Sequence, residues 1–130
     1  MTESQATTLA ERFRAAVNRF EADQPETLEF FTDDIVYSEP RFPAFRGKEA
    51  LKGYLQQLMG KHKALQASWE YTNVVVQGDQ AAVEWMVRSG VDFGGKKLEI
   101  PGASFFKVRD GKICYYCEYY DTAILQQLAE

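Results

Sequence analysis

Two glutamates in segments that favour β-strands are the side chains of this chain best suited to proton-transfer chemistry. Glu118 lies in a tyrosine-rich segment, residues 113–121, that follows an Asp110-Gly111 turn. Aromatic residues favour strands, in which alternate side chains share a face. If that face is buried, ionisation of Glu118 is costly and proton transfer near neutral pH becomes possible; if it faces solvent, Glu118 is an ordinary surface acid. The residues predicted to share this face are Cys114, Tyr116, Glu118 and Tyr120.

Glu39 is the second candidate. It closes a short predicted strand, residues 35–39, that Pro40 ends, and alternation places Tyr37 and Glu39 on one face. Two carboxyl groups in one apolar pocket can divide the roles of acid and base between them if Arg88 holds one ionised while the other stays protonated. The alternative is a buried hydrogen-bond network with a structural role alone, because a buried charge needs partners in any case.

The two cysteines, Cys114 and Cys117, have the C-x-x-C spacing of redox and zinc sites. On a strand they point to opposite faces with Cα atoms about 10 Å apart, beyond the reach of a disulfide. A zinc site needs about four ligands, and the single histidine, His62, is expected in a solvated loop. The sequence therefore predicts structural cysteines and no metal. Asp121 precedes Thr122 and is expected to cap a helix rather than to act as a pocket acid.

Length and composition limit the class of protein. A chain of 130 residues is one domain, 1–130, and 45% hydrophobic content is typical of a globular core. The net charge of −4 and dispersed basic residues argue against a nucleic-acid partner. No apolar run reaches the ~20 residues that span a bilayer, and the N-terminal residues do not resemble a signal peptide. We therefore expect a cytoplasmic protein with no membrane association.

Hydrophobic periodicity predicts helices first and strands afterwards. Apolar residues recur at helical spacing over residues 4–22, in a short helix that Pro25 opens, and in a third helix that Gly60 is expected to stop. Residues 40–47 form a predicted loop, and the period then changes to two. The predicted strands cover residues 65–77, 81–92, 96–108 and 112–121, and a short helix follows from Asp121 or Thr122. This order indicates an α+β domain whose antiparallel sheet is covered by the early helices.

Three motifs carry a resemblance to a known family. They are Phe-Thr-Asp-Asp-Ile-Val-Tyr at 31–37, Phe-Arg-Gly-Lys-Glu-Ala-Leu at 45–51, and Asp-Gly-Lys-Ile at 110–113 followed by Glu-Tyr-Tyr-Asp at 118–121. Almost the whole chain resembles the SnoaL-like branch of the nuclear transport factor 2-like (NTF2-like) superfamily. The resemblance implies a cone-shaped α+β barrel, with a curved antiparallel or mixed sheet around a mostly apolar pocket. It also implies a homodimer packed through the outer sheet face.

The resemblance extends to limonene epoxide hydrolase, which positions a water with a Tyr, an Asn and an Asp. By spacing, Tyr37 matches that Tyr, Glu39 replaces the Asn and Glu118 replaces the Asp. The Arg–Asp pair of that enzyme falls at Met86 and Arg88, so the pair is not reproduced.

Ketosteroid isomerase offers a second comparison. Its general-base Asp matches Glu39, its oxyanion-hole Tyr falls at Phe13, and its protonated Asp falls at Ser104, so both strong donors are missing. The two comparisons together imply cavity-facing positions for Glu39, Arg88, Ser104 and Glu118.

These observations predict a cofactor-free isomerase, cyclase or hydrolase that acts on a hydrophobic oxygenated substrate, with Glu118 and Glu39 as proton-transfer groups. The alternative is a non-catalytic ligand-binding or dimerisation module of the same fold. An open cavity with converging carboxyl groups favours the enzyme, and a closed core in which Arg88 holds Glu118 favours the module. The residues expected to contact the ligand are Tyr37, Arg88, Ser104, Met86, Tyr116, Tyr120 and Phe13. Trp69 and Trp85 are expected to fill core or dimer surface.

Overall fold

The computed structural model describes residues 3–93 and 95–126. The helices there are α1 (Glu3–Asn18), α2 (Pro25–Leu28), α3 (Lys48–Leu65) and α4 (Thr122–Gln126). The strands are β1 (Phe31–Glu39), β2 (Phe42–Arg46), β3 (Ser68–Gln77), β4 (Gln80–Phe93), β5 (Lys96–Arg109) and β6 (Lys112–Tyr120). The α+β class predicted from the sequence is confirmed.

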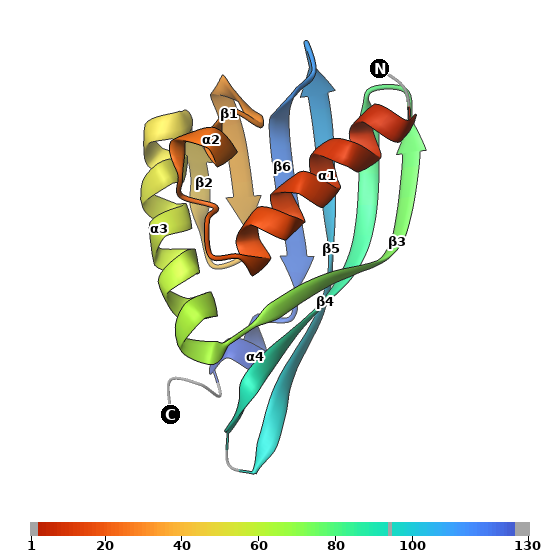
Figure 1. The fold of residues 1–130 in the computed structure, drawn as a ribbon. Coiled ribbons are helices and arrows are strands. Elements are labelled where there is room, and N and C mark those ends of the chain that lie inside the picture. Colours follow the sequence, from red (N-terminus) through yellow and green to blue (C-terminus); the bar gives the residue numbers. More distant parts are fainter. Residues whose placement is uncertain (1–2, 94, 127–130) are drawn as a thin grey trace.

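All the strands belong to one curved sheet in the order β2-β1-β6-β5-β4-β3 (Figure 1). The pairing of β1 with β6 is parallel, and the other pairings are antiparallel. The edge strands β2 and β3 do not pair with each other, so the sheet curves without closing into a barrel. The curvature produces a concave face, which is where a helix-covered sheet can enclose a cavity.

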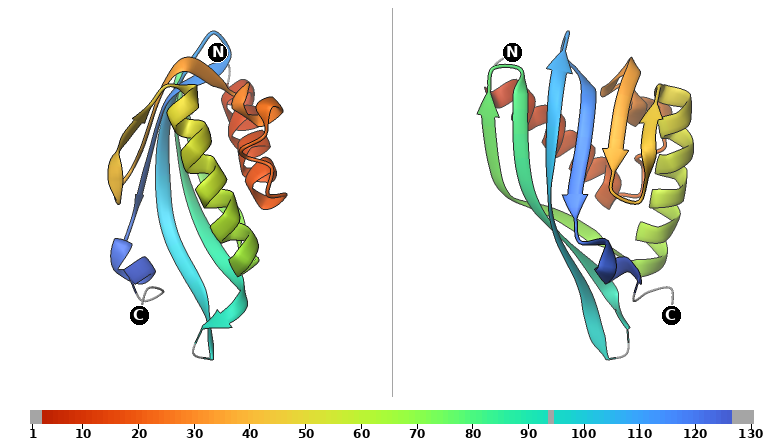
Figure 2. Two further views of the ribbon diagram at one scale, coloured as in Figure 1. Left: turned by 90° about the vertical axis from the view of Figure 1, so that its left-hand side faces the viewer. Right: turned by 180° about the vertical axis from the view of Figure 1, so that it is seen from behind.

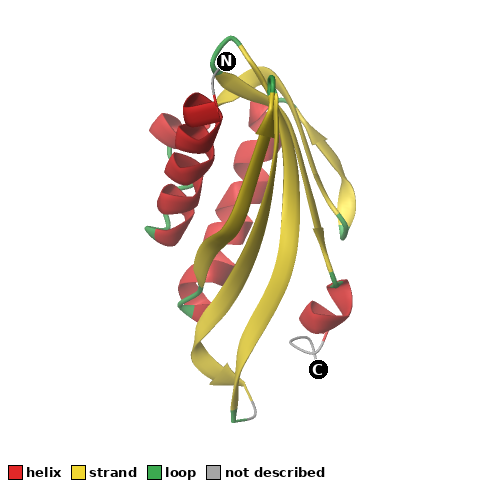
Figure 3. Ribbon diagram, turned by 90° about the vertical axis from the view of Figure 1, so that its right-hand side faces the viewer, coloured by secondary structure: helices red, strands yellow, loops and turns green. Residues whose placement is uncertain are grey.

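Helices α1 and α3 lie on the concave side of the sheet (Figures 2 and 3). Their apolar faces bury Phe13 of α1 and Leu55 of α3 completely. The sheet contributes Ile35, Phe106 and Tyr116 to the same core. Phe13 packs edge-on against the Tyr116 ring with centroids 5.7 Å apart, a favourable aromatic geometry. Among the described residues, no helix combines the length and the apolarity needed to cross a membrane.

Several predicted boundaries in the first half of the chain were wrong. Strand β1 begins at Phe31, before the exposed Asp33 and Asp34, and the expected loop 40–47 contains β2, which pairs with β1 at the sheet edge. Prolines are tolerated in such edge strands, so Pro43 does not prevent pairing. Helix α3 continues through Gly60 to Leu65, because a single glycine costs a helix only about 1 kcal/mol.

Helix α1 ends at Asn18 rather than near residue 22. The Asn18 side chain donates to the Trp69 carbonyl at 2.9 Å and accepts from the Trp69 amide at 2.7 Å. These two bonds attach the end of α1 to the start of β3. At the other end of the chain, the amide of Ala123 donates to Asp121 Oδ1 at 2.9 Å, which confirms the predicted cap of α4.

A β-bulge in β6 corrects the predicted face of Cys114. Lys107 pairs with Tyr115 and Val108 with Ile113, so Cys114 is the extra residue on its strand. The bulge interrupts the alternation: Ile113 is fully buried, whereas Cys114 is only partly buried and its Sγ lies 3.5 Å from the Lys107 carbonyl. The inward face of β6 therefore carries Tyr116, Glu118 and Tyr120, without Cys114. Both cysteines are free thiols.

Position 102 of β5 requires a glycine, because the Trp85 ring packs directly on its backbone. A Cβ at Gly102 would overlap the indole of Trp85, its partner on β4. We predict that Gly102→Ala lowers the free energy of unfolding by about 1–3 kcal/mol, because the ring must shift. Gly53→Ala in α3 is the control, since a Cβ there meets nothing within 4 Å and should stabilise the helix by roughly 0.5–1 kcal/mol. If urea unfolding shows that both substitutions change the free energy of unfolding in the same direction, the prediction is wrong.

Candidate active site

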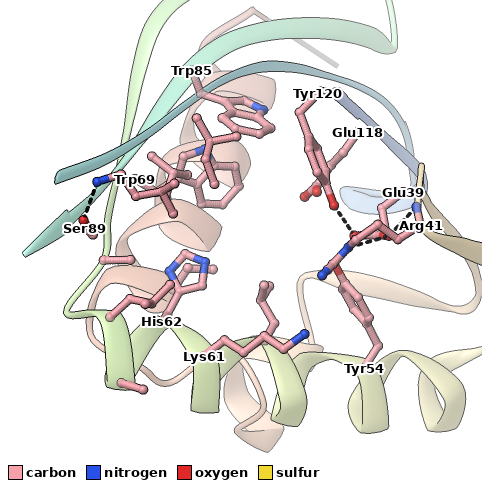
Figure 4. Close-up of a pocket in the computed structure, with 18 of the residues that line it drawn as sticks. Glu39, Arg41, Tyr54, Lys61, His62, Trp69, Trp85, Ser89, Glu118 and Tyr120 are labelled. Atoms are coloured by element: carbon pink, nitrogen blue, oxygen red, sulfur yellow. Dashed lines mark hydrogen bonds and ion pairs between the residues drawn. The ribbon is translucent and has the colours of Figure 1, made fainter. Parts of the chain in front are cut away.

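A cavity of about 470 Å³ lies between α3 and the concave face of the sheet (Figure 4). Most of its wall is apolar: Val17, Leu58, Ala64, Leu65, Ala67, Trp69, Trp85, Val87, Leu98 and Ile100. The polar residues on the wall are Tyr37, Glu39, Arg41, Tyr54, Lys61, His62, Ser89, Glu118 and Tyr120. Its size and its few polar groups are typical of small-molecule sites.

Glu118 lines the cavity, and a hydrogen bond to one of its carboxylate oxygens holds the side chain in position. Tyr37 donates a hydrogen bond of 2.7 Å to Glu118 Oε1. Within the described residues, no hydrogen-bond donor contacts Oε2. Burial raises the pKa of Glu118 to about 7, since the Tyr37 hydrogen bond offsets the lost hydration only in part and the negative charge of Glu39 adds to the rise. At neutral pH both the acid and the base form are therefore present.

Glu39 has the opposite environment. Its side chain is fully buried and forms an ion pair with Arg41, with Oε2 and Nη2 2.9 Å apart. Tyr120 and Tyr54 also donate to Oε2, at 2.6 and 3.2 Å, and the Arg41 amide donates to Oε1 at 2.7 Å. Burial alone would raise the pKa of Glu39, but the hydrogen bonds from Arg41 and Tyr120 outweigh it and hold the pKa below its ordinary value. Glu39 is therefore a fixed anion.

The two carboxyl groups thus differ in the way that acid/base sites require, one held ionised and one able to gain and lose a proton. The sequence predicted this division but assigned the stabilising arginine to Arg88. Arg41 has that position instead, two residues after Glu39 on the same turn. The environment of Glu118 suits it to move a proton, and that of Glu39 does not.

The structure brings some of the predicted ligand contacts into the cavity and leaves others behind its wall. Tyr37 and Tyr120 line the cavity with Glu39 and Glu118. Phe13, Tyr116 and Ser104 are buried in the core behind it, outside the lining. Ser104 Oγ accepts from Trp85 Nε1 at 2.8 Å and from Tyr116 at 3.0 Å, so it fixes the orientation of the Trp85 ring.

Arg88 and Met86 were placed on the wrong face of β4. Arg88 lies on the outer face and pairs with Glu70 and Glu99 at 3.2 and 3.6 Å. Met86 lines a shallow outer groove with its neighbours on β3, β5 and β6. Alternation along β4 turns Val83, Trp85 and Val87 inward. The sequence shows which side chains share a face but not which face the helices cover. The comparisons with limonene epoxide hydrolase and ketosteroid isomerase placed the polar face of β4 inward.

The places of Arg41, Tyr54 and His62 on the cavity wall were missed. Arg41 and Tyr54 bind Glu39. Trp69 and Trp85 are buried in the core, as expected, and they also form part of the cavity wall. His62, expected in a solvated loop, lies in the last turns of α3 and lines the cavity. Helical spacing could have found His62, since it follows Leu55 and Leu58 on the inward face of α3.

Within the described part of the chain, no three His, Cys, Asp or Glu side chains gather as a metal site would require. The features present define a class: an α+β protein whose helix-covered sheet encloses an apolar cavity with a carboxyl group of raised pKa on its wall. The sequence model of the SnoaL-like domain matches residues 10–116. The chain therefore belongs to the SnoaL-like domain family.

Solved structures share this fold over nearly the whole chain. A proposed isomerase of Bacillus subtilis has 21% identity and a TM-score of 0.77, covering 98% of this chain and 94% of that one. An LEH-like epoxide hydrolase of M. tuberculosis has 20% identity and a TM-score of 0.71, with 97% and 93% covered. A proposed polyketide cyclase of Xanthomonas campestris has 26% identity and a TM-score of 0.69, with 96% and 94% covered. Comparison with curated proteins gave no match.

The raised pKa of Glu118 predicts a specific pH dependence of stability. Because the folded pKa of about 7 exceeds the ordinary 4.5, stability present below pH 4.5 is lost as the pH rises through 7. Glu118→Gln should remove this loss. The free energy of unfolding of the variant minus that of the parent should therefore be up to about 3 kcal/mol larger at pH 8 than at pH 4. Urea unfolding across this range measures it, with the exposed Glu84→Gln as the control. Parallel curves for parent and Glu118→Gln would contradict the burial of this carboxyl.

Proposed function

We propose that this protein is an enzyme that moves a proton within a hydrophobic oxygenated substrate, with Glu118 as the general acid/base and no bound cofactor. One observation carries the proposal: Glu118 lines an apolar cavity and combines an Oε1 held by Tyr37, an Oε2 without a donor among the described residues, and a pKa of about 7. A carboxyl group with these properties can take a proton from carbon or oxygen and return it elsewhere on the same molecule.

Glu39 supports the reaction without exchanging protons. Its ion pair with Arg41 and the Tyr120 hydrogen bond keep it ionised, and its charge raises the pKa of Glu118. This division replaces the initial expectation of two proton-transfer groups. A lining that is mostly apolar favours a substrate with a hydrophobic body.

The family supports several reaction classes, and the site favours some of them. The fold neighbours include proteins described as an isomerase, a polyketide cyclase and an epoxide hydrolase. The arginine–aspartate pair of limonene epoxide hydrolase is not reproduced, and Arg88 lies on the outer sheet face. We therefore favour isomerisation or cyclisation through proton abstraction next to a carbonyl group over epoxide opening.

Proton exchange tests this function before the natural substrate is known. In D₂O, the parent protein should catalyse deuterium incorporation next to the carbonyl of apolar ketones, followed by NMR. Glu118→Gln should lower the rate by about 10²–10⁴-fold, because the base is removed. The parent rate should rise as the pH passes about 7, where Glu118 becomes ionised.

Glu84→Gln, on the outer face of β4, is the matched control and should exchange at the parent rate. Circular dichroism establishes that the variants fold. A Glu118→Gln variant as active as the parent would contradict the assignment. Absence of exchange across a broad ketone panel, with the ketones still bound, would favour the non-catalytic ligand-binding module.

We also propose that two copies pair through the outer sheet face, as the family resemblance implies. Val75 and Tyr119 on this face are each 61% exposed, and Tyr119 borders the shallow groove beside Met86. Light scattering after size exclusion should give a dimer mass for the parent and a larger monomer fraction for Tyr119→Arg, since a charge in an apolar interface is costly. A parent that is monomeric at micromolar concentration would contradict the pairing.

A further inference from the structure

His62 is a polar group on the cavity wall that the proposed proton transfer does not use. It is in the last turns of α3, and its ring points into the cavity on the side away from Glu118 (Figure 4). Leu58 and Leu65 share its face of α3, and Trp69 and Ser89 lie on the same side of the cavity (Figure 4). An imidazole in such a place needs a partner for its hydrogen-bonding groups.

The two ring nitrogens of His62 differ in their access. Nδ1 is buried and has no hydrogen-bond partner. Nε2 also has no partner among the described residues, and unlike Nδ1 it is not enclosed by protein. A hydrogen on Nδ1 would be an orphaned buried donor, which is the costlier arrangement. We therefore assign the hydrogen to Nε2, which is the nitrogen that a ligand can reach.

The charge state of His62 agrees with this arrangement. Burial lowers its pKa to about 4, because the charged imidazolium loses hydration. At neutral pH the ring is uncharged and offers one N–H. A neutral imidazole of this kind can polarise a carbonyl without forming an ion pair.

The other uncharged hydrogen-bond donors on the cavity wall either donate to protein acceptors already or are enclosed by protein. The hydroxyl groups of Tyr37, Tyr54 and Tyr120 donate to the two buried carboxylates, and that of Ser89 donates to a backbone carbonyl. The Trp85 N–H donates to a serine hydroxyl. The Trp69 N–H has no partner, but it is enclosed by protein. When Glu118 is ionised, His62 is the uncharged side chain among the described lining residues that has a reachable donor to offer.

The charged donors lie elsewhere on the wall. Arg41 is engaged with Glu39, and the ammonium of Lys61 points towards that pair in Figure 4. Lys61 is an exposed residue. The far part of the cavity therefore combines an apolar wall with a single neutral donor, which matches an uncharged oxygen better than a carboxylate.

We propose that His62 Nε2–H donates a hydrogen bond to a carbonyl or ether oxygen of the substrate, remote from the atom that exchanges its proton with Glu118. The substrate is then an uncharged apolar molecule with oxygen functions at two separated positions. This inference rests on the proposed function only in taking the cavity as a substrate site, because it concerns binding and not turnover.

Acetophenone is a suitable probe, because it has an apolar ring and one acceptor oxygen. α-Methylstyrene is its matched control, with a CH₂ group in place of that oxygen. Binding is followed at pH 8.5, where Glu118 is ionised and cannot donate to the ketone. Fluorescence reports it, since Trp69 and Trp85 line the cavity.

We expect His62→Leu to weaken acetophenone binding about tenfold, the effect of one lost hydrogen bond, and to leave α-methylstyrene binding unchanged. His62→Gln keeps an N–H donor and should restore part of the acetophenone affinity. Lys63→Met, at an exposed residue next to His62 that is outside the cavity lining, should change the binding of neither ligand. In the infrared, the carbonyl stretch of bound ¹³C-acetophenone should move to lower frequency in the parent and not in His62→Leu.

Imidazole NMR gives a second readout, which does not depend on substitution. His62 is the single histidine of the chain, so its ¹⁵N signals need no assignment. They should show a neutral ring protonated at Nε2, and acetophenone should shift Nε2 more than Nδ1.

The proposal is overturned if the ring is protonated at Nδ1 or if bound acetophenone leaves the Nε2 signal unmoved. It is also overturned if His62→Leu lowers the affinities for acetophenone and α-methylstyrene equally. Failure of the parent to bind acetophenone up to its solubility would also count against it. Because turnover enters none of these measurements, an inactive protein would refute the proposed function while leaving the role of His62 intact.

Discussion

The parallel pairing of β1 with β6 is the constraint on which the rest of the site depends. It aligns Tyr37 with Tyr116 and Ser38 with Cys117, and one residue further along each strand are Glu39 and Glu118. Two carboxyl groups that are far apart in the sequence therefore come side by side. The Tyr37–Glu118 hydrogen bond spans 81 residues of sequence and joins the same two strands. Both the charge pattern and the aromatic stacking of the site follow from this register.

The neighbouring carboxyl groups avoid repulsion by having unequal environments. Arg41 and two tyrosines satisfy Glu39, so its burial does not force it to take up a proton. Glu118 receives one hydrogen bond and faces apolar wall, so its proton affinity rises. Two neighbouring carboxyl groups in a low-dielectric site have different pKa values when their hydrogen-bond and charge partners differ. Behind this pair, Phe13 and Tyr37 pack against the Tyr116 ring in favourable aromatic geometries.

The fold explains how related proteins can differ in chemistry. Helices α1 and α3 and the curved sheet enclose the cavity, and most of the buried aromatic residues belong to that frame. The groups that face the cavity are few, and they can be exchanged without altering the frame. Function therefore has to be argued from the side chains on the wall and not from the fold alone. Arg41 and His62 illustrate this, since neither is part of the motifs that carry the family resemblance.

Local pattern determined much of this protein. Period-two alternation placed Tyr116, Glu118 and Tyr120 on one face, and the Asp121 cap of α4 followed from residue type. The motifs around residues 31–37 and 45–51 indicated the family. These features depend on neighbours in sequence, which is why the sequence could reveal them.

Tertiary structure decided the rest. Alternation groups the side chains of β4, but only the packing of the helices makes one face inner, and so Arg88 is outside while Trp85 is on the cavity wall. The β6 bulge removed Cys114 from the inner face by adding one residue. The continuation of α3 past Gly60 brought His62 to the cavity. Which carboxylate stays charged depended on Arg41, because electrostatic partners are set by distance in space and not by position in the chain.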